Sequence, residues 1–177
     1  MSDRTLSRLA IAAGTAALAV TAAASARPAL RQDVQVPAAL PMEKTVVVPA
    51  AGGWLDTGID VGPGEEILLR ASGEIVLQRG NPEAACGPGG LDIVTVEQPV
   101  PNANLGALIG KIAQLVASRV DADSGQEVRD EVFILFLVGP EQTVTVPFKG
   151  RLYLGVNENV VKDNGGQFSV LVTRRPG

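Results

Sequence analysis

Histidine is absent from the 177 residues of this chain, and cysteine occurs once, at Cys86. The missing imidazole excludes the commonest general base, the Ser–His and Cys–His nucleophile pairs and the usual zinc ligand. A single thiol excludes an internal disulfide, so we expect Cys86 to be buried or, in rare cases, paired with another chain. Any metal must therefore be a hard cation held by carboxylate, amide and carbonyl oxygens.

The core must be aliphatic, because aromatic residues make up only 3% of the chain while hydrophobic residues reach 46%. The 20 glycines and 12 prolines are spread along the sequence, which is typical of many short strands joined by turns. The formal net charge is −4 and there is no basic cluster, which argues against nucleic acid as a partner.

The N-terminus has the pattern of a secretory signal peptide. Arg4 and Arg8 precede an uncharged stretch, residues 9–24, and Ala24-Ser25-Ala26 then fits the small-x-small cleavage rule. We expect cleavage after Ala26, which makes residues 1–26 the signal peptide and the protein secreted or periplasmic. An uncleaved membrane anchor is the alternative, although the run is short and rich in alanine for a span.

A flexible lead-in, residues 27–43, is expected before a single domain at residues 44–177. Strands are predicted in that domain at residues 44–48, 54–61, 66–71, 74–78, 91–96, 132–138, 142–147, 151–156 and 167–173. We expect 66–71 and 74–78 to form a hairpin, and the apolar run 132–138 to be buried. About eight to ten short strands at this spacing predict an all-β fold, an antiparallel β-sandwich or a jelly roll, rather than an α/β fold.

Two stretches between these strands are less regular. Residues 105–116 combine helix-like apolar spacing with two glycines, and we expect a strand that can run into a helical turn. Residues 118–131 are the most charged and are expected to be an exposed insertion. Within them, Asp121-Ala122-Asp123-Ser124-Gly125 has the start of an EF-hand loop but none of its later ligands, so a solvated loop is the better interpretation.

The residues from 157 to 166 carry the most distinctive chemistry. They read Asn-Glu-Asn-Val-Val-Lys-Asp-Asn-Gly-Gly and lie between two predicted strands. Calcium takes six to eight oxygen ligands, and this loop offers two carboxylates, three side-chain amides and a glycine-rich backbone that can turn its carbonyls inward. The alternative is an ordinary polar turn, because Asn, Asp and Gly are also the preferred turn residues.

Several motifs occur along the chain in a fixed order. They are residues 54–59 (Trp-Leu-Asp-Thr-Gly-Ile), 71–73 (Ala-Ser-Gly), 87–90 (Gly-Pro-Gly-Gly), 106–112 (Gly-Ala-Leu-Ile-Gly-Lys-Ile), 150–157 (Gly-Arg-Leu-Tyr-Leu-Gly-Val-Asn) and 163–168 (Asp-Asn-Gly-Gly-Gln-Phe). Together they resemble the PA-IL-like galactophilic, calcium-dependent lectin family, whose domain is a small jelly roll of the galactose-binding-domain type. The resemblance covers residues 44–173. It implies a carbohydrate-binding protein, with galactosides as the expected sugars, that is not an enzyme.

In that family one calcium ion binds in the loop before the last strand and contacts two sugar hydroxyls. The resemblance implies a calcium site formed by Glu158, Asp163, Asn164, a carbonyl of Asn159 or Val160, and a distant carbonyl at about Leu77. It also places Asn157, Asp163, Asn164, Pro88 and Gly89 next to the sugar. The chain departs from the family in three ways: Glu158 replaces an aspartate, the loop is shorter, and the sugar-contacting His and Gln of the 87–90 loop have no counterpart.

The leading hypothesis is therefore an exported, calcium-dependent carbohydrate-binding module that reaches membranes only through their glycans. A weak lectin gains from avidity, which favours a homo-oligomer. The alternative is a structural or adhesion module whose calcium site is vestigial or purely stabilising. A carboxylate-only glycoside hydrolase is the third hypothesis, but nothing in the sequence places two carboxylates across a cleft.

Overall fold

The computed structural model describes residues 42–122 and 125–175. The predicted signal peptide and residues 27–41 of the lead-in lie outside them, and the described residues all belong to the second of two units in the chain, residues 37–177. Within this part of the chain no helix is long and apolar enough to cross a membrane. Its elements are β1 (Met42–Pro49), β2 (Leu55–Val61), β3 (Glu66–Val76), the 3-10 helix η1 (Pro82–Ala84), β4 (Ala85–Cys86), β5 (Leu91–Val94), β6 (Asn104–Leu105), β7 (Leu108–Val120), β8 (Glu127–Leu137), β9 (Glu141–Thr145), β10 (Gly150–Val156) and β11 (Gly165–Arg175).

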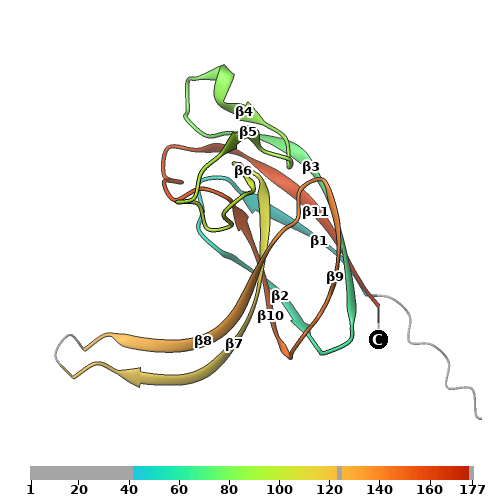
Figure 1. The fold of residues 1–177 in the computed structure, drawn as a ribbon, viewed down its shortest axis with the longest axis vertical. Coiled ribbons are helices and arrows are strands. Elements are labelled where there is room, and N and C mark those ends of the chain that lie inside the picture. The colour runs from blue at the N-terminus through green and yellow to red at the C-terminus, as the bar shows by residue number, and fades with distance from the viewer. Residues whose placement is uncertain (1–41, 123–124, 176–177) are drawn as a thin grey trace, which may run out of the picture. The chain divides into compact units, whose positions relative to one another are not determined.

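The strands form an antiparallel β-sandwich, which confirms the predicted fold class (Figure 1). One sheet has the order β1–β11–β3–β4, with β9 also paired to β3, and the other has the order β2–β10–β7–β8. A small ribbon of β5 and β6 completes the fold. Outside the β3 and β7–β8 regions, the predicted strands occur with ends displaced by one or two residues.

The two main sheets bury one aliphatic core between them. On β11, Phe168, Val170 and Val172 are fully buried and alternate with more exposed residues, as expected for a strand with one face inside. The same core cluster includes Ile67 and Leu69 of β3. From the opposite sheet it includes Ile59 and Val61 of β2, Leu108 and Ile112 of β7, and Leu152, Leu154 and Val156 of β10.

The predicted hairpin at residues 66–78 is wrong, because β3 runs without a turn from Glu66 to Val76. Ser72 and Gly73 lie inside this strand and pair with Ser169 and Phe168 of β11. Gly73 has a φ of +106°, and a Cβ atom built on it would lie 2.7 Å from the Gln167 carbonyl oxygen. The Ser-Gly pair therefore permits a close approach of two backbones rather than a chain reversal.

β7 and β8 form a long hairpin whose outer part projects from the sandwich, and we call residues 114–120 and 127–133 the arm (Figure 1). Three predictions need correction here. β7 has no helical turn. The charged residues 118–131 lie largely in paired strands rather than in a loop. The run 132–138 is not uniformly buried, since Val132 and Phe133 are about half exposed.

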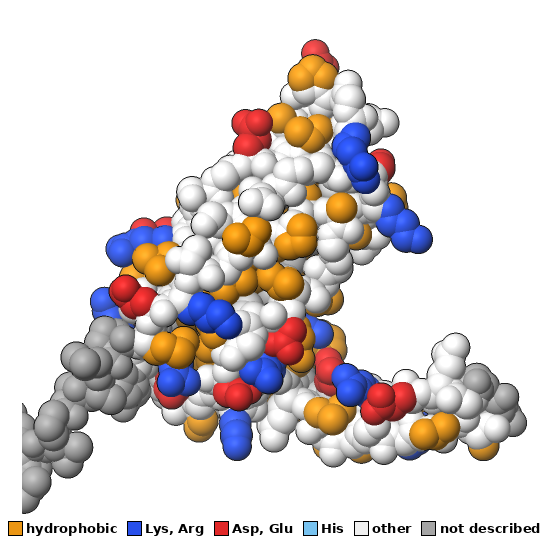
Figure 2. Space-filling view, turned by 180° about the vertical axis from the view of Figure 1, so that it is seen from behind, with side chains coloured by type: hydrophobic (Ala, Val, Ile, Leu, Met, Phe, Trp, Pro, Cys, Tyr) orange, Lys and Arg blue, Asp and Glu red, His pale blue; other side chains and the backbone are white. Residues whose placement is uncertain are grey.

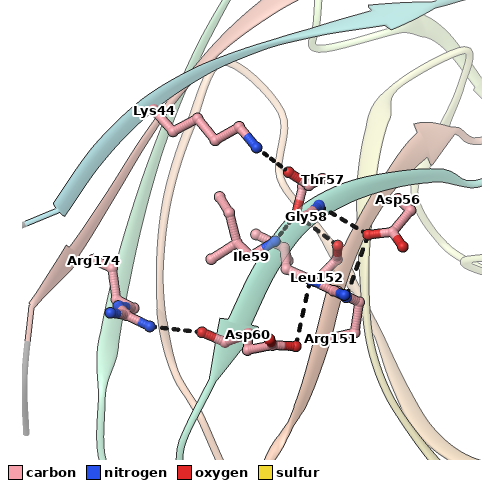
Figure 3. A network of polar contacts seen from close by, with 9 residues as sticks. All are labelled: Lys44, Asp56, Thr57, Gly58, Ile59, Asp60, Arg151, Leu152 and Arg174. Atoms are coloured by element: carbon pink, nitrogen blue, oxygen red, sulfur yellow. Dashed lines mark hydrogen bonds and ion pairs between the residues drawn. The ribbon is translucent and has the colours of Figure 1, made fainter.

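Polar contacts join the two sheets near the start of β1 (Figure 3). A β-bulge interrupts the pairing of β2 with β10, and the Thr57 hydroxyl fills the gap by donating to the Leu152 carbonyl at 2.7 Å. From the other sheet, Lys44 of β1 donates to the Thr57 carbonyl at 2.6 Å and Arg174 of β11 donates to the Asp60 carbonyl at 2.7 Å. Because these contacts come from both sheets, they fix the relative position of the two layers at this end.

The contact at Gly73 predicts a specific loss of stability. Gly73→Ala places a methyl group against the Gln167 carbonyl and imposes a side chain on a positive φ, so we expect the free energy of unfolding to fall by about 1–3 kcal/mol. Urea unfolding followed by circular dichroism measures this change. Gly53→Ala is the control, because a Cβ there meets no atom within 4 Å. Equal unfolding midpoints for the two variants would contradict the role given to Gly73.

Candidate functional site

The loop from residue 157 to 164 connects β10 to β11 and lies beside the end of β3. The β3–β11 register ends with Val76 opposite Gly165. The next residue after this end of β3 is Leu77, and the residue just before β11 is Asn164. Beyond them, the Arg79 amide donates to the Asp163 carbonyl at 2.9 Å, and the Arg79 guanidinium donates to the Lys162 carbonyl at 2.8 Å. The pairing of the strands therefore continues into the loop and holds its second half.

Asn157 holds the first half of the loop. Its side chain is fully buried, and its Nδ2 donates to the carbonyls of Val100, Ala103 and Asn104 at 3.1, 3.3 and 3.1 Å. Its Oδ1 accepts from the Val100 amide at 2.9 Å. Both polar atoms of the side chain are hydrogen-bonded to residues 100–104. Asn157 can therefore influence a ligand only by holding the loop in position.

Asn164 is also buried, with 1% of its surface exposed, but one of its polar atoms has no partner. Its Nδ2 donates to the Ala50 carbonyl at 3.3 Å and to Glu158 Oε2 at 2.5 Å. Both partners are acceptors, which fixes the orientation of the amide and leaves Oδ1 without a hydrogen bond. A buried oxygen in this state requires a donor or a cation.

The two carboxylates of the loop differ in their surroundings. Burial raises the pKa of Glu158, the hydrogen bond from Asn164 opposes this shift, and the negative charge of Asp163 adds to it. Asp163 itself is exposed. A cation beside Glu158 and Asp163 would relieve both the desolvation of Glu158 and the repulsion between the two carboxylates.

A pocket of about 190 Å³ has Glu158 in its lining. It is lined by Gly52, Gly53, Trp54, Pro99, Gly155, Val156, Glu158, Asn159 and Val161. Asn159 is held at its rim, since its Nδ2 donates to the Glu97 carbonyl at 2.5 Å. The pocket therefore combines a carboxylate and an amide with one large aromatic side chain.

Trp54, the single tryptophan of the chain, is held in place by its neighbours. A Cβ built on Gly155 would lie 3.2 Å from the indole ring, so the ring packs closely against that backbone. The ammonium group of Lys111 lies 5.5 Å from the indole centroid and 4.7 Å from the Tyr153 centroid, within the range of cation–π attraction. Trp54 therefore presents a partly exposed and well-supported aromatic surface.

The other predicted site residues differ in their burial and in their contacts. Leu77 is buried and comes next to Asn164, whereas the Val160 side chain is two-thirds exposed. The Pro88 carbonyl accepts from the Leu108 amide at 2.9 Å, and the Gly89 carbonyl accepts from Asn104 Nδ2 at 3.1 Å. These last two bonds tie the 87–90 loop to β6 and β7.

No sequence pattern groups Trp54, Gly52, Gly53 and Pro99 with the loop, although they line its pocket. The signal that could have found them is the Gly-Gly-Trp sequence, which exposes an aromatic side chain next to a flexible turn. These residues lie far from the loop in the sequence. In the folded protein, the hydrogen bond from Asn164 to the Ala50 carbonyl joins the segment before Trp54 to the loop.

The donor set fits calcium better than it fits a transition metal. Within residues 42–122 and 125–175 no three Asp, Glu, His or Cys side chains come together, so carboxylates alone do not form a site. The oxygens available near Asn164 are two carboxylates, the unpartnered amide oxygen and backbone carbonyls, which are hard ligands. Calcium takes six to eight oxygen ligands, so backbone carbonyls and oxygens of a bound small molecule would have to complete its coordination shell.

Cys86 lies near this centre but is chemically protected. It is buried, as expected, and pairs with Ile75 of β3. Burial raises the pKa of its thiol to about 11, with smaller contributions from the Glu158 and Glu74 carboxylates. Because the thiolate is the reactive form, this thiol is neutral and inert at physiological pH.

The fold is similar to that of a solved lectin domain described as "EclA N-terminal domain; PllA-like lectin". The match has a TM-score of 0.50 and 24% sequence identity, and it covers 74% of this chain and 95% of that one. No protein-family model matches the sequence, and the comparison with curated proteins finds no match either. The structural likeness supports the β-sandwich fold of this chain.

The bonds of Asn157 predict that it is needed for stability. Asn157→Ala removes the bonds to the Val100 amide and to the carbonyls of Val100, Ala103 and Asn104, although the Val100 and Asn104 carbonyls each keep a backbone donor. We therefore expect a loss of about 1–3 kcal/mol in the free energy of unfolding. Chemical unfolding of the variant measures it. Asn159→Ala is the matched control, since that side chain is exposed and makes one bond. An Asn157→Ala protein as stable as the control would show that these bonds contribute little.

Proposed function

We propose that this protein is a carbohydrate-binding module of the lectin type, in which a calcium ion links the 157–164 loop to the hydroxyls of a sugar. The observation that carries the proposal is the buried Asn164 Oδ1, which has no partner and belongs to a side chain bonded to Glu158. The likeness of the fold to a lectin domain supports the same class of function.

The residues that would hold the ion are Glu158, Asp163 and Asn164 through their side chains. Backbone carbonyls at Asn159 or Val160, and at Leu77 next to Asn164, would add further oxygens. When bound, calcium supplies positive charge and open coordination positions that two neighbouring sugar hydroxyls can fill. The task of Asn157 is to hold the loop in the conformation that presents these ligands.

The pocket next to Glu158 is the proposed place for the sugar ring. Its aromatic side chain, Trp54, offers an apolar surface on which the C–H face of a pyranose can pack. Glu158 and Asn159 offer polar atoms at the same pocket, so the orientation of the ring would be set by hydrogen bonds. Galactosides, which the family resemblance implies, are the first sugars to test, and Pro88 and Gly89 remain candidate contacts.

We further propose that the protein binds sugar without catalysis and acts outside the cytoplasm. The described carboxylates of the site, Glu158 and Asp163, are both assigned to calcium, so neither is available as a separate acid or base. Residues 1–26 carry the export signal in this proposal.

A structural or adhesion role is the second candidate, favoured by the exposed apolar side chains of the β7–β8 arm. It predicts a protein partner and no response to sugars. Calcium alone would not distinguish the two roles, whereas a sugar-dependent signal would.

Calcium is predicted to stabilise the folded protein. A ligand that binds only the folded state adds RT ln(1 + [L]/Kd), about 2.7 kcal/mol at a hundredfold excess over Kd, so the Tm should rise with calcium concentration. Thermal unfolding in chelator and then in increasing calcium measures the shift. Glu158→Gln and Asp163→Asn should each reduce it strongly.

Glu66→Gln serves as the matched control for the calcium experiment, because Glu66 is an exposed carboxylate at the start of β3, the end of that strand opposite to the loop. It should keep the full shift. A wild-type Tm that stays constant up to millimolar calcium would remove the metal from the proposal.

Trp54→Ala is predicted to weaken sugar binding without removing calcium. Loss of one aromatic packing surface should cost on the order of 1 kcal/mol, or roughly five- to tenfold in affinity. A galactoside titration in the presence of calcium measures the affinity, and the calcium-dependent Tm shift is measured on the same variant. Trp54→Phe, which keeps an aromatic ring, should lose less. Unchanged sugar affinity in Trp54→Ala would exclude the pocket as the sugar site.

A further inference from the structure

The arm is a two-stranded ribbon that no third strand of the described residues supports. β10 pairs with β7 only as far as Ala113, and every residue of β7 from 114 to 120 is exposed. Figure 1 shows the paired ends of β7 and β8 leaving the sandwich. A ribbon of two strands is at best marginally stable in water by itself, so the arm gains from further packing.

The arm region also carries a large share of the exposed apolar surface. Twelve large hydrophobic side chains are exposed in the described residues, and six of them lie on β7 and β8: Leu115, Val116, Val120, Val132, Phe133 and Leu137. In Figure 2 the projecting hairpin shows hydrophobic side chains among charged ones. Exposed apolar residues gathered on one element mark an interaction surface.

β8 offers an open edge along its eleven residues. Its only strand neighbour among the described residues is β7, so its other side has backbone groups available for pairing. Residues 132–137 read Val-Phe-Ile-Leu-Phe-Leu and contain neither a charge nor a proline, the usual devices that protect an edge strand. This edge is therefore suited to receive another strand.

We propose that β8 pairs antiparallel with β8 of a second copy, so that the sheet β2–β10–β7–β8 continues from one chain into the other. A two-fold axis places identical strands antiparallel, which is the arrangement that edge pairing of this kind requires. The interface would draw on eighteen residues, namely the seven exposed residues of β7 and, on β8, six exposed and five half-buried residues. This number approaches the roughly 20–30 residues a side of a standard protein interface.

The charges of the arm also favour a second copy over a partner of one strong charge. Arg119 and Arg129 alternate with Glu127, Asp130 and Glu131, and the pairs Arg119–Asp130 and Arg129–Glu127 lie at 2.7 and 3.3 Å. An element with both signs interspersed does not repel its own copy, and it gives no advantage to a purely acidic or basic surface. The inference does not depend on the calcium site.

Sedimentation of the protein obtained by expressing the full chain tests the proposal. We expect a particle of twice the monomer mass at micromolar concentration; the monomer mass is 18.3 kDa if residues 1–26 are retained, and lower if they are removed. Val132→Lys places a charge on the pairing edge and should shift the particle to the monomer. Val47→Lys is the matched control, because Val47 is similarly exposed on β1, the edge strand of the other sheet, and it should leave the dimer intact.

A second measurement covers the case in which Val132→Lys disturbs folding. Val132→Cys should give a disulfide-linked dimer on mild oxidation, whereas Val47→Cys should not, and the buried Cys86 should stay free in both. A wild-type monomer across the micromolar range would overturn the proposal. So would a dimer that Val47→Lys dissociates and Val132→Lys leaves unchanged, or a dimer whose Val132→Cys variant does not crosslink.

Discussion

The pairing of β11 with β3 is the constraint on which the candidate site depends. These strands form eleven consecutive residue pairs, from Arg175 opposite Glu66 to Gly165 opposite Val76, and β11 also pairs with β1. The alternate residues of β11 fill the core, so a slip by one residue would expose Phe168, Val170 and Val172. Because the register is fixed by burial, the position of Asn164 beside the end of β3 is fixed as well. The hydrophobic core thus fixes the end of the loop at Asn164, while the hydrogen bonds of Asn157 fix its beginning.

The two buried asparagines of that loop, Asn157 and Asn164, have different roles. Asn157 is surrounded by acceptors and one donor from residues 100–104, and its bonds serve the fold. Asn164 uses its amide nitrogen for Glu158 and the Ala50 carbonyl but keeps its oxygen without a partner. A buried oxygen without a partner lowers the stability of the folded protein until a donor hydrogen-bonds it or a cation coordinates it. A ligand that binds Asn164 Oδ1 would therefore stabilise the fold. Through Ala50 the same side chain also draws the turn before Trp54 towards the loop, which joins the metal ligands to the proposed sugar pocket.

Much of the fold could be predicted from the sequence, because short β-rich runs separated by Gly and Pro have few other arrangements. The errors have physical causes. Ser72-Gly73 has the composition of a turn, yet the glycine is needed where two strands approach closely. Residues 132–137 have the composition of a buried strand, but burial depends on a second layer that the pattern cannot reveal. In the same way the loop chemistry was visible at Glu158, Asp163 and Asn164, whereas the distinct roles of Asn157 and Asn164 depend on contacts with distant segments. The sequence shows Trp54 only as part of a motif, because its place at the pocket depends on contacts that form on folding.

The proposed function requires that one calcium ion binds at Asn164 and Glu158, beside Trp54. The most direct test is terbium luminescence, because terbium occupies calcium sites and is sensitised by a nearby indole, and Trp54 is the single tryptophan of the chain. The account predicts emission that saturates at one ion per chain, is reversed by calcium, and is lost in Glu158→Gln and Asp163→Asn. Absence of sensitised emission, or emission that both variants retain in full, would contradict it.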